Sequence, residues 1–322
     1  MKKIVSCAVI LLTASFTMSA QRYTEITAPE GEQRSGSGHF LSNSDLHLSE
    51  NAFDGSTAAS LFWRSDSLQV SEIVSSESVQ YSKVGHHGPA VENIGSAFRI
   101  YFNDSGAIDV YSKRGTQMEL MKYLWYPTET QQIEEGAGCD EYLVGKTVGL
   151  GGIALWDGRQ EIKLQATKGR TARIGKTEQG SFAEMIAYGV HCNGEPHDIS
   201  IRVDVFNGDR VGQVTATELH GKQVRFLTGI NFHPGESVRV GEGYASVWGV
   251  HPSDVSQHPI PLGAGIFFDP KVFPDVFETA DLVRLISVPA SSVQTRIVAA
   301  STKEAELGTQ EEFERYVSMW KP

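Results

Sequence analysis

The feature that most constrains this chain is a regular alternation of short β-prone runs and turn residues between Leu68 and Ala300. Runs rich in Val, Ile, Thr, Tyr and Phe recur roughly every ten to fourteen residues, with Asp-Gly and Asn-Gly pairs near several of the turns. The predicted strands are 97–102, 107–112, 152–156, 160–165, 170–177, 181–190, 198–206, 211–218, 224–232, 244–250, 264–268, 283–287 and 293–299. Because no helices alternate with these runs, a parallel βαβ sheet is disfavoured, and the absence of a fixed repeat disfavours a propeller or solenoid.

This number of strands exceeds a seven-stranded immunoglobulin-type sandwich and fits a large antiparallel two-sheet sandwich whose concave sheet carries a groove. One helix is expected, at the C-terminus. Thr309 and Glu312 form a capping box, and Phe313, Val317 and Trp320 follow at helical spacing. We therefore predict an all-β fold with a C-terminal helix that packs on a sheet and places Trp320 in the core.

The start of the chain has the pattern of a cleaved signal peptide. Lys2 and Lys3 precede an apolar run that ends in small residues at Ser19-Ala20. We expect a signal peptide at 1–20, an irregular leader at 21–60, and a single β-sandwich domain at 61–322. The expected location is the periplasm or the medium, without membrane insertion, since no later stretch approaches the roughly 20 apolar residues of a membrane helix.

The formal net charge of −11 argues against non-specific binding to nucleic acid or anionic lipid. A few local Arg and Lys residues could still form a cleft for an anionic ligand. Cys139 and Cys192 leave two alternatives open, a disulfide in an oxidising compartment or two separate thiols. No metal or cofactor is predicted, because the chain has no CxxC pair, HExxH motif or EF-hand loop. The glycine-rich run 145–152 is not a phosphate loop, since its Gly-Lys-Thr precedes further glycines and then a strand.

The segment 97–112 is a predicted hairpin, with the turn residues 103–106 between its strands. Side chains alternate along each strand, so the hairpin has one apolar face and one polar face. The apolar face, expected to face the core, carries Phe98, Ile100, Phe102, Ile108 and Val110. The polar face carries Arg99, Tyr101, Asp109, Tyr111 and Lys113.

Two interpretations of the polar face stay open. Because a guanidinium binds a carboxylate bidentately, and tyrosines donate hydrogen bonds and stack on pyranose rings, the face suits an anionic sugar. The alternative is an ordinary solvated face with charge pairs across the strands. The preceding segment adds His86, His87, Glu92 and Asn93, which strengthens the first interpretation.

Histidines suit acid–base chemistry near neutral pH. His86 and His87 are adjacent, so in an extended chain they point apart and do not ligate one metal. Either is a candidate general base or acid, and the alternative is a pair of ordinary loop residues. His233 ends a predicted strand and is a candidate to face a groove. The histidines expected to be structural are His191, His197, His220, His251 and His258.

In five blocks the sequence resembles the DUF4861 family, a domain of unknown function found in exported proteins associated with polysaccharide breakdown. The blocks are 88–93, 98–102, 108–114, 125–129 and 144–158, and a looser likeness runs from Thr228 to the end. The resemblance implies a galactose-mutarotase-like sandwich, shared with several polysaccharide lyases and sugar epimerases. It implies no agreed reaction or catalytic residue. Val91 and Ser112 stand where the family often has Trp and Gly, and the first departure leaves an aromatic stacking contact unsupported.

The leading hypothesis is a lyase that acts on uronic-acid-containing glycans by β-elimination. Arg99 or Lys113 would neutralise the uronate carboxylate, a tyrosine or histidine would take the C5 proton, and a tyrosine or protonated histidine would protonate the leaving oxygen. The predicted catalytic residues are Arg99, Tyr111, Lys113, His86, His87, Glu92 and His233. The predicted substrate-binding residues are Asn93, Tyr101, Asp109, Trp125 and Trp248.

Three alternatives stay open. Glu92 and Asp109 could be the carboxylate pair of a glycoside hydrolase, or a histidine and a glutamate could serve an epimerase or mutarotase. The third alternative is a non-catalytic glycan-binding protein, with Trp125, Tyr126 and Trp248 as a stacking platform. All of them predict a carbohydrate partner.

Overall fold

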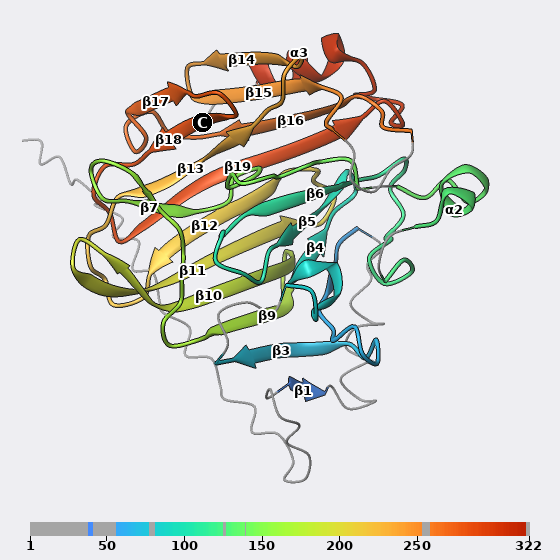
Figure 1. Ribbon diagram of the computed structural model, residues 1–322. Helices are drawn as coiled ribbons and strands as arrows, with labels where there is room; N and C mark the ends of the chain where they lie inside the picture. The colour runs from blue at the N-terminus through green and yellow to red at the C-terminus, as the bar shows by residue number, and fades with distance from the viewer. Residues whose placement is uncertain are drawn as a thin grey trace, which may run out of the picture. The chain divides into compact units, whose positions relative to one another are not determined.

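The largest of the three sheets has ten strands, and each strand pairs antiparallel with its neighbours. The computed structural model describes residues 38–40 (backbone only), 56–76, 81–124, 127–138, 140–252 and 258–319, all within the unit Gln33–Pro322. In spatial order the strands are β1 (Gly38–Phe40), β3 (Val70–Ser75), β9 (Arg170–Thr177), β10 (Gly180–Cys192), β11 (Glu195–Phe206), β12 (Gly212–Glu218), β19 (Ser292–Ser301), β16 (Leu262–Phe267), β15 (Tyr244–Gly249) and β14 (Ser237–Gly241) (Figure 1).

Two smaller sheets form the second layer. One has the order β17 (Asp275–Glu278), β18 (Leu282–Ile286), β13 (Phe226–Asn231), β7 (Ala154–Trp156) and β8 (Glu161–Ile162). The other has the order β2 (Ala58–Ser60), β4 (Ala90–Glu92), β5 (Ser96–Ile100) and β6 (Ile108–Ser112). An isolated bridge between Ile108 and Gly149 attaches the second of these sheets to the chain that leads into β7. A Cβ at Gly149 would lie 2.1 Å from the Ile108 carbonyl oxygen, so this approach requires glycine.

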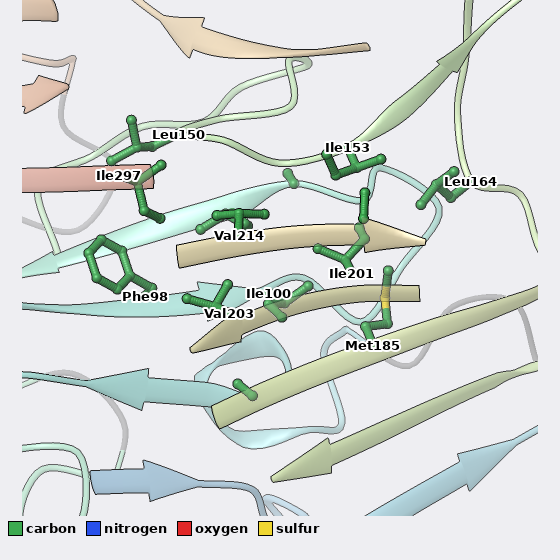
Figure 2. Packing of buried hydrophobic residues seen from close by; sticks show 14 of the residues in the cluster. Phe98, Ile100, Leu150, Ile153, Leu164, Met185, Ile201, Val203, Val214 and Ile297 are labelled. Carbon is green, nitrogen blue, oxygen red and sulfur yellow. The ribbon is translucent and has the colours of Figure 1, made fainter. Parts of the chain in front are cut away.

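The hydrophobic core fills the space between the large sheet and the smaller ones. Phe98 and Ile100 of β5 belong to the same buried cluster as Val203 of β11, Val214 of β12 and Ile297 of β19 (Figure 2). These side chains come from strands far apart in the sequence, and all are at most 1% exposed. The apolar face of the hairpin therefore faces the core, as its alternation predicts.

The predicted fold class, a large antiparallel two-sheet sandwich with a C-terminal helix, is confirmed, with the second layer divided into two sheets. The helix α3 spans Gln310–Met319, buries Phe313 and Val317, and begins where the Thr309 hydroxyl accepts a hydrogen bond from the Glu312 N–H. Trp320 lies outside the described residues. No helix of the described part is long and apolar enough to cross a membrane.

Several elements differ from the sequence-based expectation. Strands β1 and β2 fall inside the range 21–60 that was expected to be irregular, and β2 pairs with β4. The short or edge strands β4, β14 and β17 carry too few alternating residues to be recognised. A short helix, α2 (Glu129–Glu134), begins with a capping box between Thr128 and Gln131. The segment 1–37 lies outside the described residues, so the signal peptide stays a prediction.

Candidate active site

The polar face of the β5–β6 hairpin is buried, which corrects the expectation of an open groove. Arg99 and Asp109 are direct cross-strand partners, and each is 1% exposed. The Arg99 guanidinium binds the Asp109 carboxylate at 2.5 Å and the Asp140 carboxylate at 2.5 Å. The Tyr101 hydroxyl donates to Asp109 at 2.7 Å. We call Arg99, Tyr101, Asp109 and Asp140 the arginine cluster.

The segment that brings Asp140 to Arg99 packs directly on β6. A Cβ at Gly138 would lie 1.9 Å from the carbonyl oxygen of Ser112, so only glycine allows this approach. The Gly138 N–H donates to Glu119 at 2.8 Å, and Tyr111 also donates to Glu119, at 2.6 Å. These contacts cover the hairpin and leave Tyr111, a predicted general base, 3% exposed in a structural hydrogen bond.

Burial and the charge of Asp140 raise the pKa of Asp109 to about 7, against the opposing effect of Arg99. Burial is the larger cause. Two carboxyl groups share one guanidinium in this cluster. The arginine cluster carries no net positive charge with which to attract a uronate carboxylate.

Lys113, Glu92 and Asn93 form a second buried group in the same sheet. The Lys113 ammonium lies 3.2 Å from Glu92 and donates to the Asn93 carbonyl oxygen at 2.7 Å. Glu92 is 0% exposed and accepts hydrogen bonds from the backbone N–H groups of Glu119 and Leu120. Both groups therefore have internal partners, and the catalytic roles of Lys113 and Glu92 stay predictions.

The Asn93 side chain also has a structural task, since its oxygen accepts hydrogen bonds from the N–H groups of Gly95 and Ser96 and so forms the β4–β5 turn. Its Nδ2 is buried without a hydrogen-bond partner among the described residues, and its substrate-binding role stays a prediction.

His86 and His87 lie in a short turn (η1, Gly85–His87) and point to different surroundings, as predicted for neighbours. His86 is 2% exposed, with its Nε2 at 3.2 Å from the Ser60 hydroxyl, and burial lowers its pKa to about 3. His87 is half-buried and stacks on Tyr81, with ring centroids 3.9 Å apart. Burial, and then the charge of Arg99, lower the pKa of His87 to about 4.

Tyr81, His87 and Tyr101 form a half-buried aromatic edge beside the arginine cluster. Tyr81 and Tyr101 meet edge to face with centroids 4.9 Å apart. His87 Nδ1 lies 3.3 Å from the Tyr81 carbonyl oxygen, which can only accept, so Nδ1 carries the proton of the neutral ring. This edge keeps Tyr101 as a candidate substrate-binding residue.

A second polar group, which we call the histidine cluster, surrounds the peptide group of Leu143. Its members are Tyr142, Asn231, His233, Glu236 and His251. The Leu143 N–H donates to His251 Nδ1 at 3.1 Å, and the Leu143 carbonyl oxygen lies 2.9 Å from both Asn231 Nδ2 and His233 Nε2. The segment 140–143 therefore contributes to both clusters, with Asp140 on Arg99 and Tyr142 on the ring of His251.

These contacts fix the proton positions of the two histidines. Because His251 Nδ1 accepts from a backbone N–H, its neutral ring carries the proton on Nε2. Burial, and then the nearby His233, lower the pKa of His251 to about 3, so the ring is neutral near pH 7. His233 Nε2 lies 2.9 Å from the Leu143 carbonyl oxygen, which can only accept, and 3.3 Å from Asn231 Nδ2, which can only donate. The shorter contact requires a proton on Nε2, so in its neutral form His233 keeps a lone pair on Nδ1. His233 is half-buried, while His251 is 1% exposed.

The histidine cluster leaves several buried atoms without hydrogen-bond partners in the described part of the chain. They are Tyr142 Oη, Asn231 Oδ1, Glu236 Oε1 and His251 Nε2. His251 Nε2 and Glu236 Oε1 are 3.4 Å apart but not aligned for a hydrogen bond. Such atoms are costly to leave bare, because each loses its water on burial. Unpaired buried atoms of this kind call for an explanation, of which a role in chemistry is one.

Electrostatics links the two clusters. Burial and the carboxylates of Glu236 and Asp109 raise the pKa of Tyr142, so its hydroxyl keeps its proton. Burial also raises the pKa of Glu236, against the opposing hydrogen bond from the His233 N–H. The cluster thus combines a lone-pair nitrogen, a protonated phenol and a carboxyl group whose pKa is raised by burial.

Of the predicted aromatic platform, the structure describes Trp248. It is 8% exposed and packs in a separate hydrophobic cluster with Phe313 of α3, at a centroid distance of 5.7 Å. Trp248 therefore contributes to the helix–sheet contact, and its substrate-binding role stays a prediction. Trp125, Tyr126 and Cys139 lie outside the described residues, and Cys192 is a free buried thiol. Within the described ranges no group of His, Cys, Asp and Glu has metal-binding geometry.

Of the predicted residues, Arg99, Tyr101, Asp109 and His233 come to the two clusters, and His87 lies at their edge. Sequence reasoning missed Asp140, Tyr142, Glu236 and His251. All four lie outside regular periodic segments, or, for Glu236, just before an edge strand. The one available sequence signal was the closeness of His233 to Glu236 at a strand end.

The chain is similar to a protein family and, weakly, to a solved structure. A family model described as Domain of unknown function (DUF4861) matches residues 48–322. No curated protein matches the chain. Among solved structures the chain is similar to the 4-alpha-glucanotransferase from Thermococcus litoralis, at 10% identity and a TM-score of 0.33. That match covers 66% of this chain and 39% of the other, and at this TM-score it supports no conclusion about this protein.

Proposed function

The chain belongs to the DUF4861 family, whose description assigns no reaction, and from the chemistry of the histidine cluster we propose an exported carbohydrate-active enzyme that cleaves uronic-acid-containing glycans by β-elimination. One observation carries the proposal. The half-buried His233, with a lone pair on Nδ1, lies in the same cluster as four buried polar atoms that lack hydrogen-bond partners among the described residues. Elimination requires one base, one acid and one group that neutralises the uronate carboxylate.

His233 is the proposed base. Its Nε2 is engaged by the Leu143 carbonyl oxygen, so its Nδ1 is the nitrogen left to accept the C5 proton. The electron pair of the C5–H bond forms the C4–C5 double bond, and the C4–O bond to the leaving sugar breaks. The imidazolium that results is stabilised by the Leu143 carbonyl oxygen, which accepts from its Nε2–H.

Glu236 is the proposed neutralising group, because Arg99 and Lys113 already bind carboxylates. Burial raises the pKa of Glu236, and its Oε1 has no hydrogen-bond partner among the described residues. A carboxylic acid that donates to the uronate carboxylate lowers the cost of charge that develops at C5. Its position fits this task. Glu236 Oε2 accepts a hydrogen bond from the backbone N–H of His233, so the carboxyl group lies next to the residue that is the proposed base.

Tyr142 is the proposed acid. Its hydroxyl is buried without a partner, and its raised pKa keeps the proton on the oxygen until a leaving alkoxide develops. The aromatic edge of Tyr81, His87 and Tyr101 supplies faces on which sugar rings can stack. The arginine cluster holds the segment 140–143 in place and takes no part in the bond changes.

The proposal is tested by mixing the whole protein with a panel of polyuronates and mixed uronic polysaccharides while the absorbance of unsaturated uronate is followed. A rise in absorbance with new reducing ends is expected for at least one substrate. New reducing ends without absorbance would contradict elimination and indicate hydrolysis.

Burial of both expected cations favours one alternative, a non-catalytic glycan-binding protein. Saturable binding of a polyuronate with neither absorbance nor new reducing ends would support that alternative. Export remains part of the proposal and rests on the pattern at 1–20. Mass spectrometry of the mature protein is expected to find Gln21 as its first residue.

A further inference from the structure

A hollow of about 610 Å³ lies at the opposite end of β13 from the histidine cluster. Strand β13 begins at Phe226, which pairs with Leu155 of β7 beside the hollow, and it ends at Asn231 in the histidine cluster. The hollow is lined by Trp156 at the end of β7 and Asp157 after it, by the tip of the β10–β11 hairpin, and by the loop that leads into β13. Its volume is within the range of about 300–1,000 Å³ that is usual for small-molecule sites.

The cations that line the hollow are already neutralised. Lys222 binds Glu195 at 2.9 Å, and Arg225 binds Asp275 at 2.5 Å. His197, which is 6% exposed, lies with its Nδ1 3.2 Å from the Glu218 carboxylate. An anionic ligand would therefore have to displace an existing ion pair, which favours a neutral ligand.

The groups that remain suit hydroxyl recognition. Because the Glu218 carboxylate engages His197 Nδ1, Nε2 is the ring nitrogen left to form a hydrogen bond with a ligand hydroxyl group, which can both donate and accept. The side-chain amides of Asn193 and Gln223 have no partner among the described residues, and each offers both donors and an acceptor. Asp157 uses Oδ1 for the N–H groups of Arg159 and Gln160, which leaves Oδ2 as a further acceptor.

Trp156 adds an apolar surface to this polar lining. It is half-buried, and the Arg284 guanidinium lies 5.5 Å from its ring centroid. An indole beside amides and a carboxylate matches a ring that has C–H groups on its faces and hydroxyl groups on its edge. We propose that this hollow is a second carbohydrate-binding site, separate from the histidine cluster, that takes a neutral pyranose unit of a glycan.

The proposal does not rest on the reaction proposed above, since it uses none of the same residues. It is tested by isothermal titration calorimetry of the whole protein with cellotriose, xylotriose, maltotriose and chitotriose, and with trigalacturonate as the anionic comparison. At least one neutral trisaccharide is expected to bind, and Trp156→Ala is expected to weaken that binding at least about 10-fold. Phe277→Ala removes an aromatic ring that is 52% exposed and lies outside the hollow, so it is expected to leave binding unchanged.

Gln223→Trp provides a variant that does not depend on the packing of Trp156, because Gln223 is exposed and a large ring there narrows the hollow. It is expected to reduce binding to a similar degree. Binding that is equal in wild type and both variants, or no binding of any neutral trisaccharide, would overturn the proposal. His233→Ala is expected to keep this binding, so loss of turnover in that variant and loss of binding in Trp156→Ala are separate results.

Discussion

The arginine cluster and the histidine cluster share the segment 140–143 but treat their polar groups in opposite ways. In the arginine cluster, as at Lys113, buried charges meet opposite charges at 2.5 to 3.2 Å. In the histidine cluster, the His251 ring is neutral near pH 7 and the His233 ring is half-buried. Four buried atoms of this cluster lack hydrogen-bond partners in the described chain. Buried ion pairs of the first kind specify a fold and resist change. A buried group with unused donors and acceptors is the better candidate for chemistry.

The largest expected effect is on the arginine cluster. Arg99→Ala leaves the Asp109 and Asp140 carboxylates buried without their cation, so the free energy of unfolding should fall by about 3–5 kcal/mol. Urea denaturation measures this. Arg315→Ala, which removes a surface pair at 57% exposure, should change it by about 0.5 kcal/mol or less. A loss below about 1 kcal/mol for Arg99→Ala would show that this cluster is not structural.

A smaller stability effect is expected in the histidine cluster. His251→Phe keeps an aromatic ring against Tyr142 but removes the acceptor of the Leu143 N–H, so the free energy of unfolding should fall by about 1–3 kcal/mol. The control His191→Phe changes an exposed histidine and should be nearly neutral. A loss as large as that of Arg99→Ala would remove the distinction between the two clusters.

The two clusters should also respond to pH with opposite signs. The pKa of His251 is about 3 in the folded protein and 6.5 as its ordinary value. Between these values the unfolded state binds more protons, so this group's contribution to stability falls as the pH falls, by about 1.4 kcal/mol per pH unit. His251→Phe should therefore flatten the rise of stability with pH in that window.

Asp109 has the opposite sign, because its pKa is about 7 in the folded protein and 3.8 as its ordinary value. Between those values the folded state binds more protons, so stability falls as pH rises. Asp109→Asn should therefore steepen the rise of stability with pH. Denaturation of wild type and both variants at a series of pH values measures the two slopes, and equal slopes in all three proteins would contradict the assigned shifts.

The sequence predicted local features well and the covering of the site poorly. The two-residue alternation correctly divided the hairpin between Phe98 and Arg99, because sheet pleating fixes the faces regardless of what lies above. It could not predict that Glu119, Gly138 and Asp140 cover the polar face, since they lie outside the strands and their contacts depend on close approaches such as Gly138 on Ser112.

Long-range convergence explains the other misses. His251 was expected to be structural, and it reaches the site only because residues 108 positions apart meet at the Leu143–His251 hydrogen bond. Trp248 precedes His251 by three residues, but the strand directs it to the opposite surroundings, under α3. Residue type alone does not show that His251 enters the histidine cluster while Trp248 packs under α3. That difference depends on the strand register, which is set by the whole sheet.

The central claim, that the histidine cluster performs proton abstraction, is tested most directly by comparing His233→Ala with His191→Ala on a polyuronate that the wild type cleaves. The absorbance of unsaturated uronate gives the rate, and the thermal unfolding midpoint confirms that both variants are folded. We predict that His233→Ala lowers kcat by at least about 100-fold, the usual contribution of a general base, while His191→Ala retains the wild-type rate. A folded His233→Ala variant that cleaves as fast as the control would contradict the claim.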